Sequence, residues 1–247
     1  MPVEVYEEDG FQYRPEMIRE KIGPRTKAII VNSPSNPTGN LLDPERMAEI
    51  AKLGPLVISD EIYHGLVYEG KEHSILEFTD RAVVLNGFSK RYSMTGFRVG
   101  YCIVPEEFVR PMQKVAQNFF ISTGDFVQWA ALCALKEAGP DVETMRETFN
   151  QRRKFIVPRL KELGFGITVE PTGAFYVLAN AKKFTSDSYG FAFEILEQAK
   201  VGVAPGIDFG ANGEGYLRFS YAASMDKIKK GLDRIEKFLK EKYLLEK

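Results

Sequence analysis

Short, compact apolar runs dominate the first hundred residues and predict strands, because buried parallel strands are continuous rather than alternating hydrophobic segments. These runs cover 27–31, 55–59, 82–85 and 99–104, and an alternating run at 3–6 predicts one more short strand. Apolar residues at helical spacing predict helices at 15–22, 106–118 and 125–136. Asp43, as a cap with Pro44 in the first turn, predicts another helix at 43–53. The repeated order of strand, helix and strand predicts an α/β protein with a mostly parallel sheet and flanking helices.

The second half of the chain has a different pattern. A long helix is expected from Asp141 to Leu163, and Pro158 should kink it or end its regular part. Strands are then predicted at 167–170, 174–178, 201–204 and 216–221, and helices at 189–200 and 225–242. This order indicates a smaller C-terminal α+β domain. The predicted division is 1–140 for a large domain, 141–163 for the linking helix and 164–247 for the small domain.

Composition narrows the class of protein. The 247 residues carry 33 basic and 34 acidic side chains, so charge favours neither nucleic acid nor an anionic membrane as a partner. No apolar run is long enough to span a bilayer, and no leader pattern opens the chain. Cys102 and Cys133 have apolar neighbours and are expected to be buried free thiols, while His64 and His73 lack metal-ligand spacing. A cytoplasmic globular protein without a metal is predicted.

Polar residues follow the ends of the predicted strands. Asn36, Asp60 and Lys90 come after three of them, at the edge where open parallel sheets bind ligands. A lysine at the end of a core strand can be desolvated, which favours its neutral, nucleophilic form. Arg98 lies close to Lys90 in sequence, and together with the hydroxyls of Ser89, Ser93 and Thr95 it would suit a phosphate dianion.

Each candidate also has a structural interpretation. Asn36 could make an Asx turn before Pro37, and Asp60 could cap the segment after its strand. Arg218, inside the strand predicted at 216–221, could be an edge charge, and Lys90 could be a solvated turn residue. Taken one at a time these structural interpretations are favoured, but the order in which the residues occur favours a shared site.

That order resembles a known family. Ser-Asn-Pro-Thr-Gly, Asp-Glu-Ile-Tyr, Ser-Lys, Thr-Gly-Phe-Arg-Val-Gly-Tyr and Arg-Phe-Ser-Tyr-Ala begin at Ser35, Asp60, Ser89, Thr95 and Arg218. In combination they resemble the class I/II aminotransferases, which are pyridoxal-phosphate enzymes of the aspartate aminotransferase fold (fold type I). The resemblance covers nearly the whole chain, including 171–176 and 204–206.

The resemblance implies a role for every candidate. Lys90 would be the catalytic residue, forming the Schiff base with pyridoxal 5′-phosphate and moving a proton between the substrate and the cofactor. Asp60 would face the pyridine nitrogen, Asn36 and Tyr63 the ring oxygen, and Arg98 with Ser89 the phosphate. The implied cofactor-binding set is Asn36, Asp60, Tyr63, Ser89, Lys90 and Arg98, and the implied substrate-binding set is Asn36 and Arg218.

The implied function is transfer of an amino group between an amino acid and a 2-oxo acid by a homodimer. Another reaction on the same cofactor, β-elimination or racemisation, stays open because Lys90 and Arg218 would serve it equally. A further alternative is a weakly active or non-catalytic fragment that lacks the family's N-terminal part, whose phosphate-binding helix start is expected upstream of Met1.

Family members often carry a hydroxyl three residues before the lysine, where this chain has Gly87. The glycine-rich segment 210–215 lacks a following helix start and predicts a turn rather than a nucleotide site.

Overall fold

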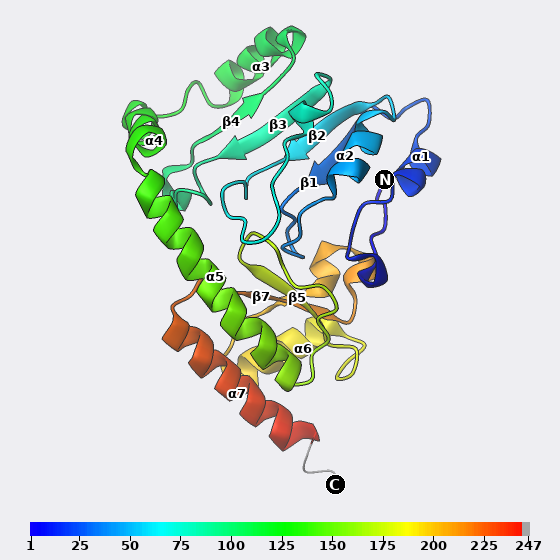
Figure 1. Cartoon of the computed structure of the whole chain (residues 1–247), viewed down its shortest axis with the longest axis vertical. Coiled ribbons are helices and arrows are strands. Elements are labelled where there is room, and N and C mark those ends of the chain that lie inside the picture. Colours follow the sequence, from blue (N-terminus) through cyan, green and yellow to red (C-terminus); the bar gives the residue numbers. More distant parts are fainter. Residues whose placement is uncertain (244–247) are drawn as a thin grey trace. The chain divides into compact units, whose positions relative to one another are not determined.

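The computed structural model describes residues 1–243 and contains two compact units, each built on its own sheet (Figure 1). The first unit comprises residues 1–3, 12–35 and 41–146. The second comprises residues 4–11 and 36–40 and the chain from residue 147 onward. The predicted domain boundaries at 140 and 163 stay a prediction. No helix in the described part of the chain is long and apolar enough to cross a membrane.

The first unit is organised around a four-stranded sheet. Its strands lie in the order β1 (Ala28–Asn32), β2 (Leu56–Asp60), β3 (Ala82–Gly87) and β4 (Gly100–Ile103). The first three strands are parallel and β4 is antiparallel to β3, so the sheet is mostly parallel as predicted. Asn32 pairs with Asp60 and Asp60 with Leu85, which brings the carboxyl ends of three strands to one edge.

One face of this sheet carries the core of the first unit. Its buried strand residues are Ile29, Val31, Val57, Ala82 and Val84, packed with Ile18 of α1 (Pro15–Lys21) and with Met47 and Ile50 of α2 (Pro44–Ala51). The Asp43 side chain accepts hydrogen bonds from Glu45 N at 2.9 Å and Arg46 N at 3.1 Å, which confirms the predicted helix start. On the other face Ile30 is 72% exposed, because successive side chains of a strand point to opposite faces.

Three helices follow β4. They are α3 (Glu106–Phe119), α4 (Asp125–Glu137) and α5 (Gly139–Glu162), close to the predicted bounds. Ala131 and Ala134 of α4 pack against Phe88 and Met94 in the segment after β3, whereas no residue of α3 is buried. Helix α5 continues through Pro158 to Glu162, so the proline does not end it.

The second unit has a small antiparallel sheet in the order β5 (Tyr176–Asn180), β7 (Tyr216–Ser220), β6 (Ala204–Pro205). Helix α6 (Ser188–Glu194) continues as a π-helical turn at Ile195–Ala199, on which α7 (Met225–Tyr243) packs. Helices and antiparallel strands in this order agree with the predicted α+β pattern. Figure 1 shows β5 and β7 side by side, with α6 in yellow and α7 in orange to red.

Two predicted strands are wrong. Residues 3–6 form no strand, and residues 167–170 form none either; next to them Gly166 makes an isolated bridge to Asn180. Just after the first segment, the Glu7 carboxylate accepts hydrogen bonds from Thr168 Oγ1 at 2.8 Å and from Tyr216 Oη at 2.7 Å. Thr168 is therefore bonded through its side chain rather than through a backbone ladder.

The predicted burial of both cysteines is also wrong. Cys102 and Cys133 are free thiols, as expected, but both are exposed. Every side chain of β4 is exposed, which accounts for Cys102. Helix α4 is apolar on several sides and buries only part of its surface, so apolar neighbours of Cys133 in the sequence do not imply burial.

Candidate functional site

Asp60 ends β2 and is held by bonds to both its backbone and its carboxylate. Its carbonyl oxygen accepts from Ser33 N at 3.1 Å and Asn32 Nδ2 at 2.9 Å, which ties it to the end of β1. Its Oδ1 accepts from Ile62 N at 3.1 Å, an Asx-type turn that starts the next loop. The structural role foreseen for Asp60 is therefore present, and the carboxylate is fixed at the carboxyl edge of the sheet.

Glu61, the next residue, is a buried carboxylate that the sequence did not single out. It is 3% exposed and accepts from Ser59 Oγ at 2.9 Å, Ser74 Oγ at 3.1 Å and Ile75 N at 3.0 Å. Its Oε2 also lies 3.4 Å from His64 Nδ1. A buried charge needs such partners to be tolerated, and these four fix the loop after β2.

Tyr63 and Lys90 meet at the same edge of the sheet. Tyr63 is 3% exposed, and the Lys90 Nζ lies 5.9 Å from the centre of its ring, within reach of a cation–π contact. Lys90 is half-buried in the turn after β3, where Ser93 N donates to its carbonyl oxygen at 3.2 Å. Two neighbouring parallel strands thus deliver a carboxylate, a phenol and an amine.

Ser89 and Arg98 lie in the loop between β3 and β4. Ser89 is half-buried, whereas Arg98 is exposed, has a left-handed backbone (φ 54°) and donates from Nη1 to Thr95 O at 2.8 Å. The base of this loop is tight, since a Cβ on Gly87 would lie 2.9 Å from the Cα of Gly100. That close approach explains why glycine, rather than a residue with a hydroxyl, stands three positions before Lys90.

The second cluster belongs to the second unit and centres on Arg218 of β7. Its Nη1 donates to Asn36 Oδ1 at 2.8 Å. Its Cζ lies 4.4 Å from the ring centre of Tyr176 and 4.9 Å from that of Phe209. Its Nε is buried and has no hydrogen-bond partner within residues 1–243. A buried guanidinium N–H without an acceptor is costly, and a carboxylate would satisfy it with a strong, charge-assisted bond.

Asn36 is positioned by the short segment that it begins. At the end of that segment Gly39 O accepts from Thr172 N at 3.0 Å and from Gly173 N at 2.7 Å. Gly39 has φ 75°, and a Cβ there would lie 2.6 Å from Pro171 Cβ. Glycine is therefore required both by the backbone conformation and by the close approach of the turn at 171–173.

The predicted site residues thus fall into two clusters, one within each unit. Asp60, Tyr63, Ser89, Lys90 and Arg98 belong to the first, and Asn36 and Arg218 to the second. Sequence reasoning missed the aromatic neighbours of Arg218, which are Tyr176 and Phe209. Only Tyr176 lies in a segment, 171–176, that the resemblance covered. In the part of the chain that the structure describes, no group of three or more His, Cys, Asp or Glu side chains could hold a metal ion.

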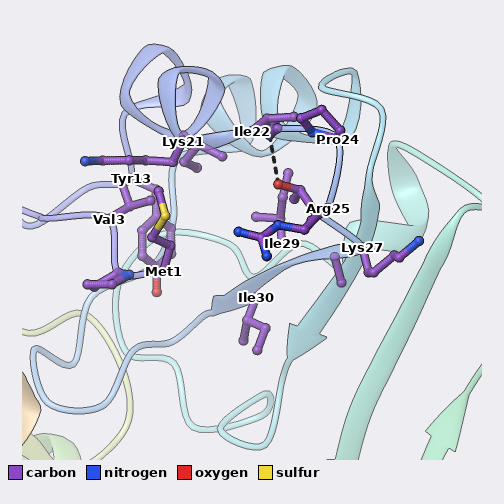
Figure 2. Close-up of a pocket in the computed structure, with 15 residues that line it drawn as sticks. Met1, Val3, Tyr13, Lys21, Ile22, Pro24, Arg25, Lys27, Ile29 and Ile30 are labelled. Carbon is purple, nitrogen blue, oxygen red and sulfur yellow. Dashed lines mark hydrogen bonds between the residues drawn. The ribbon is translucent and has the colours of Figure 1, made fainter.

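A cavity of about 900 Å³ lies elsewhere in the first unit, along the free side of β1 (Figure 2). Its lining is apolar around Val3, Ile22 and Ile30, and its charged side chains are Lys21, Arg25 and Lys27. Figure 2 shows that these residues come from the N-terminal segment, α1, the loop after it and β1. None of the predicted site residues lines this cavity.

Comparison with known proteins identifies the family. The chain belongs to the class I and II aminotransferases, since the sequence model of the family described as "Aminotransferase class I and II" matches residues 1–235. A (5-formylfuran-3-yl)methyl phosphate transaminase of Methanocaldococcus jannaschii is 42% identical over 228 residues, which are 91% of this chain and 60% of that protein. An aspartate aminotransferase of Pyrococcus abyssi is 39% identical over 255 residues, covering 98% of this chain and 65% of its own.

Solved structures agree with the fold. The crystal structure of an aromatic aminotransferase from Pyrococcus horikoshii superposes with a TM-score of 0.95 at 36% identity, covering 99% of this chain and 68% of that one. The aspartate aminotransferase fold expected from the resemblance is thereby confirmed. The chain spans 60% and 65% of the length of the two curated relatives.

Proposed function

We propose that this chain carries the active-site chemistry of an amino-acid:2-oxo-acid aminotransferase that uses pyridoxal 5′-phosphate. The observation that carries the proposal is the Arg218 side chain, which is bonded to Asn36 through Nη1 and holds a buried Nε without an acceptor within residues 1–243. Amino acids and 2-oxo acids share an α-carboxylate, and a guanidinium fork binds a carboxylate in two parallel hydrogen bonds. Membership of the aminotransferase family and the names of its relatives support this assignment.

The residues of the first cluster fit the cofactor chemically. Asp60, Tyr63 and Lys90 supply a carboxylate, a phenol and an amine from adjacent strand ends, and Ser89 and Arg98 add a hydroxyl and a guanidinium. When bound, pyridoxal phosphate supplies an electron sink for the carbanion that forms at the substrate Cα. Lys90 would hold the cofactor through Nζ, and Ser89 and Arg98 would bind its phosphate.

Each remaining residue has a binding or proton-handling task. Asp60 would hold the proton on the ring nitrogen, because a fixed carboxylate stabilises the positive charge there. Arginine has no acceptor, so the Asn36 oxygen accepts from Arg218. The contact of Asn36 and of Tyr63 with the ring oxygen of the cofactor is what the resemblance to the family implies. Arg218 would orient the substrate, and Lys90 would move the proton at the substrate Cα.

Further parts of the proposal come from the sequence. A cytoplasmic homodimer, the large and small domains at 1–140 and 164–247, and amino-acid and 2-oxo-acid substrates stay predictions. The named substrates of the relatives range from aspartate to a furan phosphate, so the proposal assigns no side-chain specificity.

A spectroscopic titration tests the function. Pyridoxal phosphate is added to the purified chain while the absorption band of lysine-bound cofactor is followed, and one amino donor, glutamate, is then added. We expect the lysine-bound band to convert to that of the aminated cofactor, with 2-oxoglutarate as the product. Loss of ammonia or racemised glutamate would replace amino-group transfer by another reaction on the same cofactor. Absence of any spectral change with saturating pyridoxal phosphate would overturn the proposal for these 247 residues.

A further inference from the structure

We propose that Arg153 is a positioning residue that holds the Asn36–Arg218 pair in its carboxylate-binding arrangement; this inference rests on the proposed function. Arg153 lies on α5 and is 2% exposed. Its Nε donates to Asn150 Oδ1 at 3.1 Å and its Nη1 to Pro171 O at 3.0 Å. A fully buried guanidinium is costly to desolvate, and these two hydrogen bonds offset part of that cost.

Pro171, whose carbonyl accepts from Arg153, is the first residue of the turn at 171–173 that contacts Gly39. The two amides that follow, Thr172 N and Gly173 N, both donate to Gly39 O, at 3.0 and 2.7 Å. The atoms on both sides are in close contact, since a Cβ on Gly39 would lie 2.6 Å from Pro171 Cβ. Arg153 therefore holds the start of the turn at Pro171, and the next two amides of the same turn hold Gly39.

The contacts between Gly39 and the turn at 171–173 are linked to Arg218 in two ways, through Asn36 and through Tyr176. Asn36, three positions before Gly39, accepts the bond from Arg218 Nη1. Tyr176, three positions after Gly173, carries the ring that lies 4.4 Å from the Arg218 guanidinium. Gly39 also packs against the Tyr176 carbonyl, 2.9 Å from the position of a Cβ. A shift of the turn at 171–173 would thus displace the hydrogen-bond partner and the stacking partner of Arg218 together.

The guanidinium is the part of Arg153 that this role needs. A methionine would fill much of the same volume without donating to Pro171, and a lysine could keep one bond but not the fork. Lys154, the next residue on α5, is exposed and supplies a matched control that removes one positive charge from the same helix. The three variants Arg153→Met, Arg153→Lys and Lys154→Met in the whole chain separate positioning from charge.

Two measurements test the inference. The first is hydrogen–deuterium exchange of the Thr172 and Gly173 amides, with the β5 and β7 amides as an internal reference for overall stability. The second is the dissociation constant of 2-oxoglutarate for the cofactor-loaded protein, compared with that of pyridoxal phosphate itself. We expect Arg153→Met to speed the exchange of both amides and to weaken 2-oxoglutarate binding, each about tenfold. Arg153→Lys should show a smaller change, and Lys154→Met none.

Other outcomes have distinct meanings. Equal acceleration of the turn amides and the β5 and β7 amides, with cofactor and 2-oxoglutarate affinities falling together, would overturn the inference and leave Arg153 as a general stabiliser. Unchanged exchange and affinity in Arg153→Met would also overturn it. If the parent chain fails to bind 2-oxoglutarate at all, the proposed function fails. The positioning of Asn36 and Arg218 is then decided by amide exchange and by the NMR shift of the Arg218 Nε–H, which should move in Arg153→Met and not in Lys154→Met.

Discussion

Arg218 and Asn36 are 182 positions apart in the sequence, yet Arg218 Nη1 donates to Asn36 Oδ1 at 2.8 Å. The bond uses one prong of the guanidinium, and the buried Nε has no acceptor within residues 1–243. Because the aromatic rings of Tyr176 and Phe209 lie close to the same guanidinium, its plane is restricted before any ligand arrives. Such preorganisation lowers the entropic cost of binding a carboxylate.

Arg218→Lys should therefore weaken 2-oxoglutarate binding about tenfold or more, because a point charge replaces a two-pronged donor and one charge-assisted hydrogen bond is lost. The absorption spectrum of the bound cofactor should stay unchanged. The measurement is a titration of the cofactor-loaded protein. A spectrum that shifts with the substitution would instead assign Arg218 to the cofactor.

Lys90 should be the residue that carries the cofactor. Borohydride reduction of the pyridoxal-phosphate complex, followed by peptide mapping, should place the pyridoxyl group on Lys90. Lys114, an exposed lysine of α3, serves as the internal control and should stay unlabelled. Label found mainly on Lys114 would contradict the assignment.

Asp60→Ala should impair catalysis much more than folding. The carboxylate lies at a strand end and its proposed partner is a pyridinium, so its loss removes charge stabilisation that grows toward the transition state. We expect a loss of about 3 kcal/mol in transition-state stabilisation, or roughly a hundredfold in the single-turnover rate. Asp80→Ala, at an exposed position, is the control. A loss below tenfold would argue for a role of Asp60 in the Asx turn alone.

Glu61→Ala should destabilise the first unit. The substitution leaves Ser59 Oγ, Ser74 Oγ and Ile75 N without their shared acceptor in a buried place. Because each unsatisfied buried group costs about 1–3 kcal/mol, we expect the free energy of unfolding to fall by about 3 kcal/mol or more. Urea unfolding measures it, with Glu20→Ala on the surface of α1 as the control. Equal unfolding midpoints for the two variants would refute the prediction.

The stability of the second unit should depend on pH through Glu7. Burial alone would raise the pKa of Glu7, but hydrogen bonds from Tyr216, Asn180 and Thr168 outweigh it and lower the pKa below its ordinary value of 4.5. A carboxylate with a lowered folded-state pKa contributes stability above the unfolded-state pKa and loses it as pH falls through the folded-state pKa. Thermal unfolding between pH 6 and 3 should therefore show a decline beginning near the ordinary glutamate pKa.

Glu7→Gln provides the comparison for that experiment. The amide keeps the shape of the side chain but does not titrate in this range, so the decline below the ordinary glutamate pKa should be shallower. Parallel curves for the parent chain and Glu7→Gln would show that other carboxylates dominate the acid response.

Local patterns in the sequence were sufficient to predict most of the first unit. The compact apolar runs identified β1, β2 and β3, and Asp43 followed by Pro44 identified the start of α2, because these features depend on residues near in sequence. The expected gathering of Asp60 and Lys90 at one sheet edge followed from parallel pairing alone.

Features that depend on distant residues could not be predicted in this way. The alternation at 167–170 looks like a strand, but the partner of Thr168 is the Glu7 side chain, far away in the sequence. The exposure of Cys133 depends on which side of an apolar helix is covered, and hydrophobicity on all sides carries no such information. The contacts of Tyr176 and Phe209 with Arg218 are made by the tertiary fold, so local patterns in the sequence could not predict them.

The composition of the second unit has a consequence for recombination between relatives. Residues 4–11 and 36–40 belong to that unit although residues of the first unit flank them in the chain. A single genetic crossover near residue 147 would join the chain after this point from one parent to the 36–40 segment of the other parent. Asn36 and Gly39 would then come from one parent, and the Arg218 and Thr172 that bond to them from the other. Chimaeras that exchange 4–11 and 36–40 together with everything after residue 146 should keep their carboxylate site, and single-crossover chimaeras should keep it only where the two parents agree at these contacts.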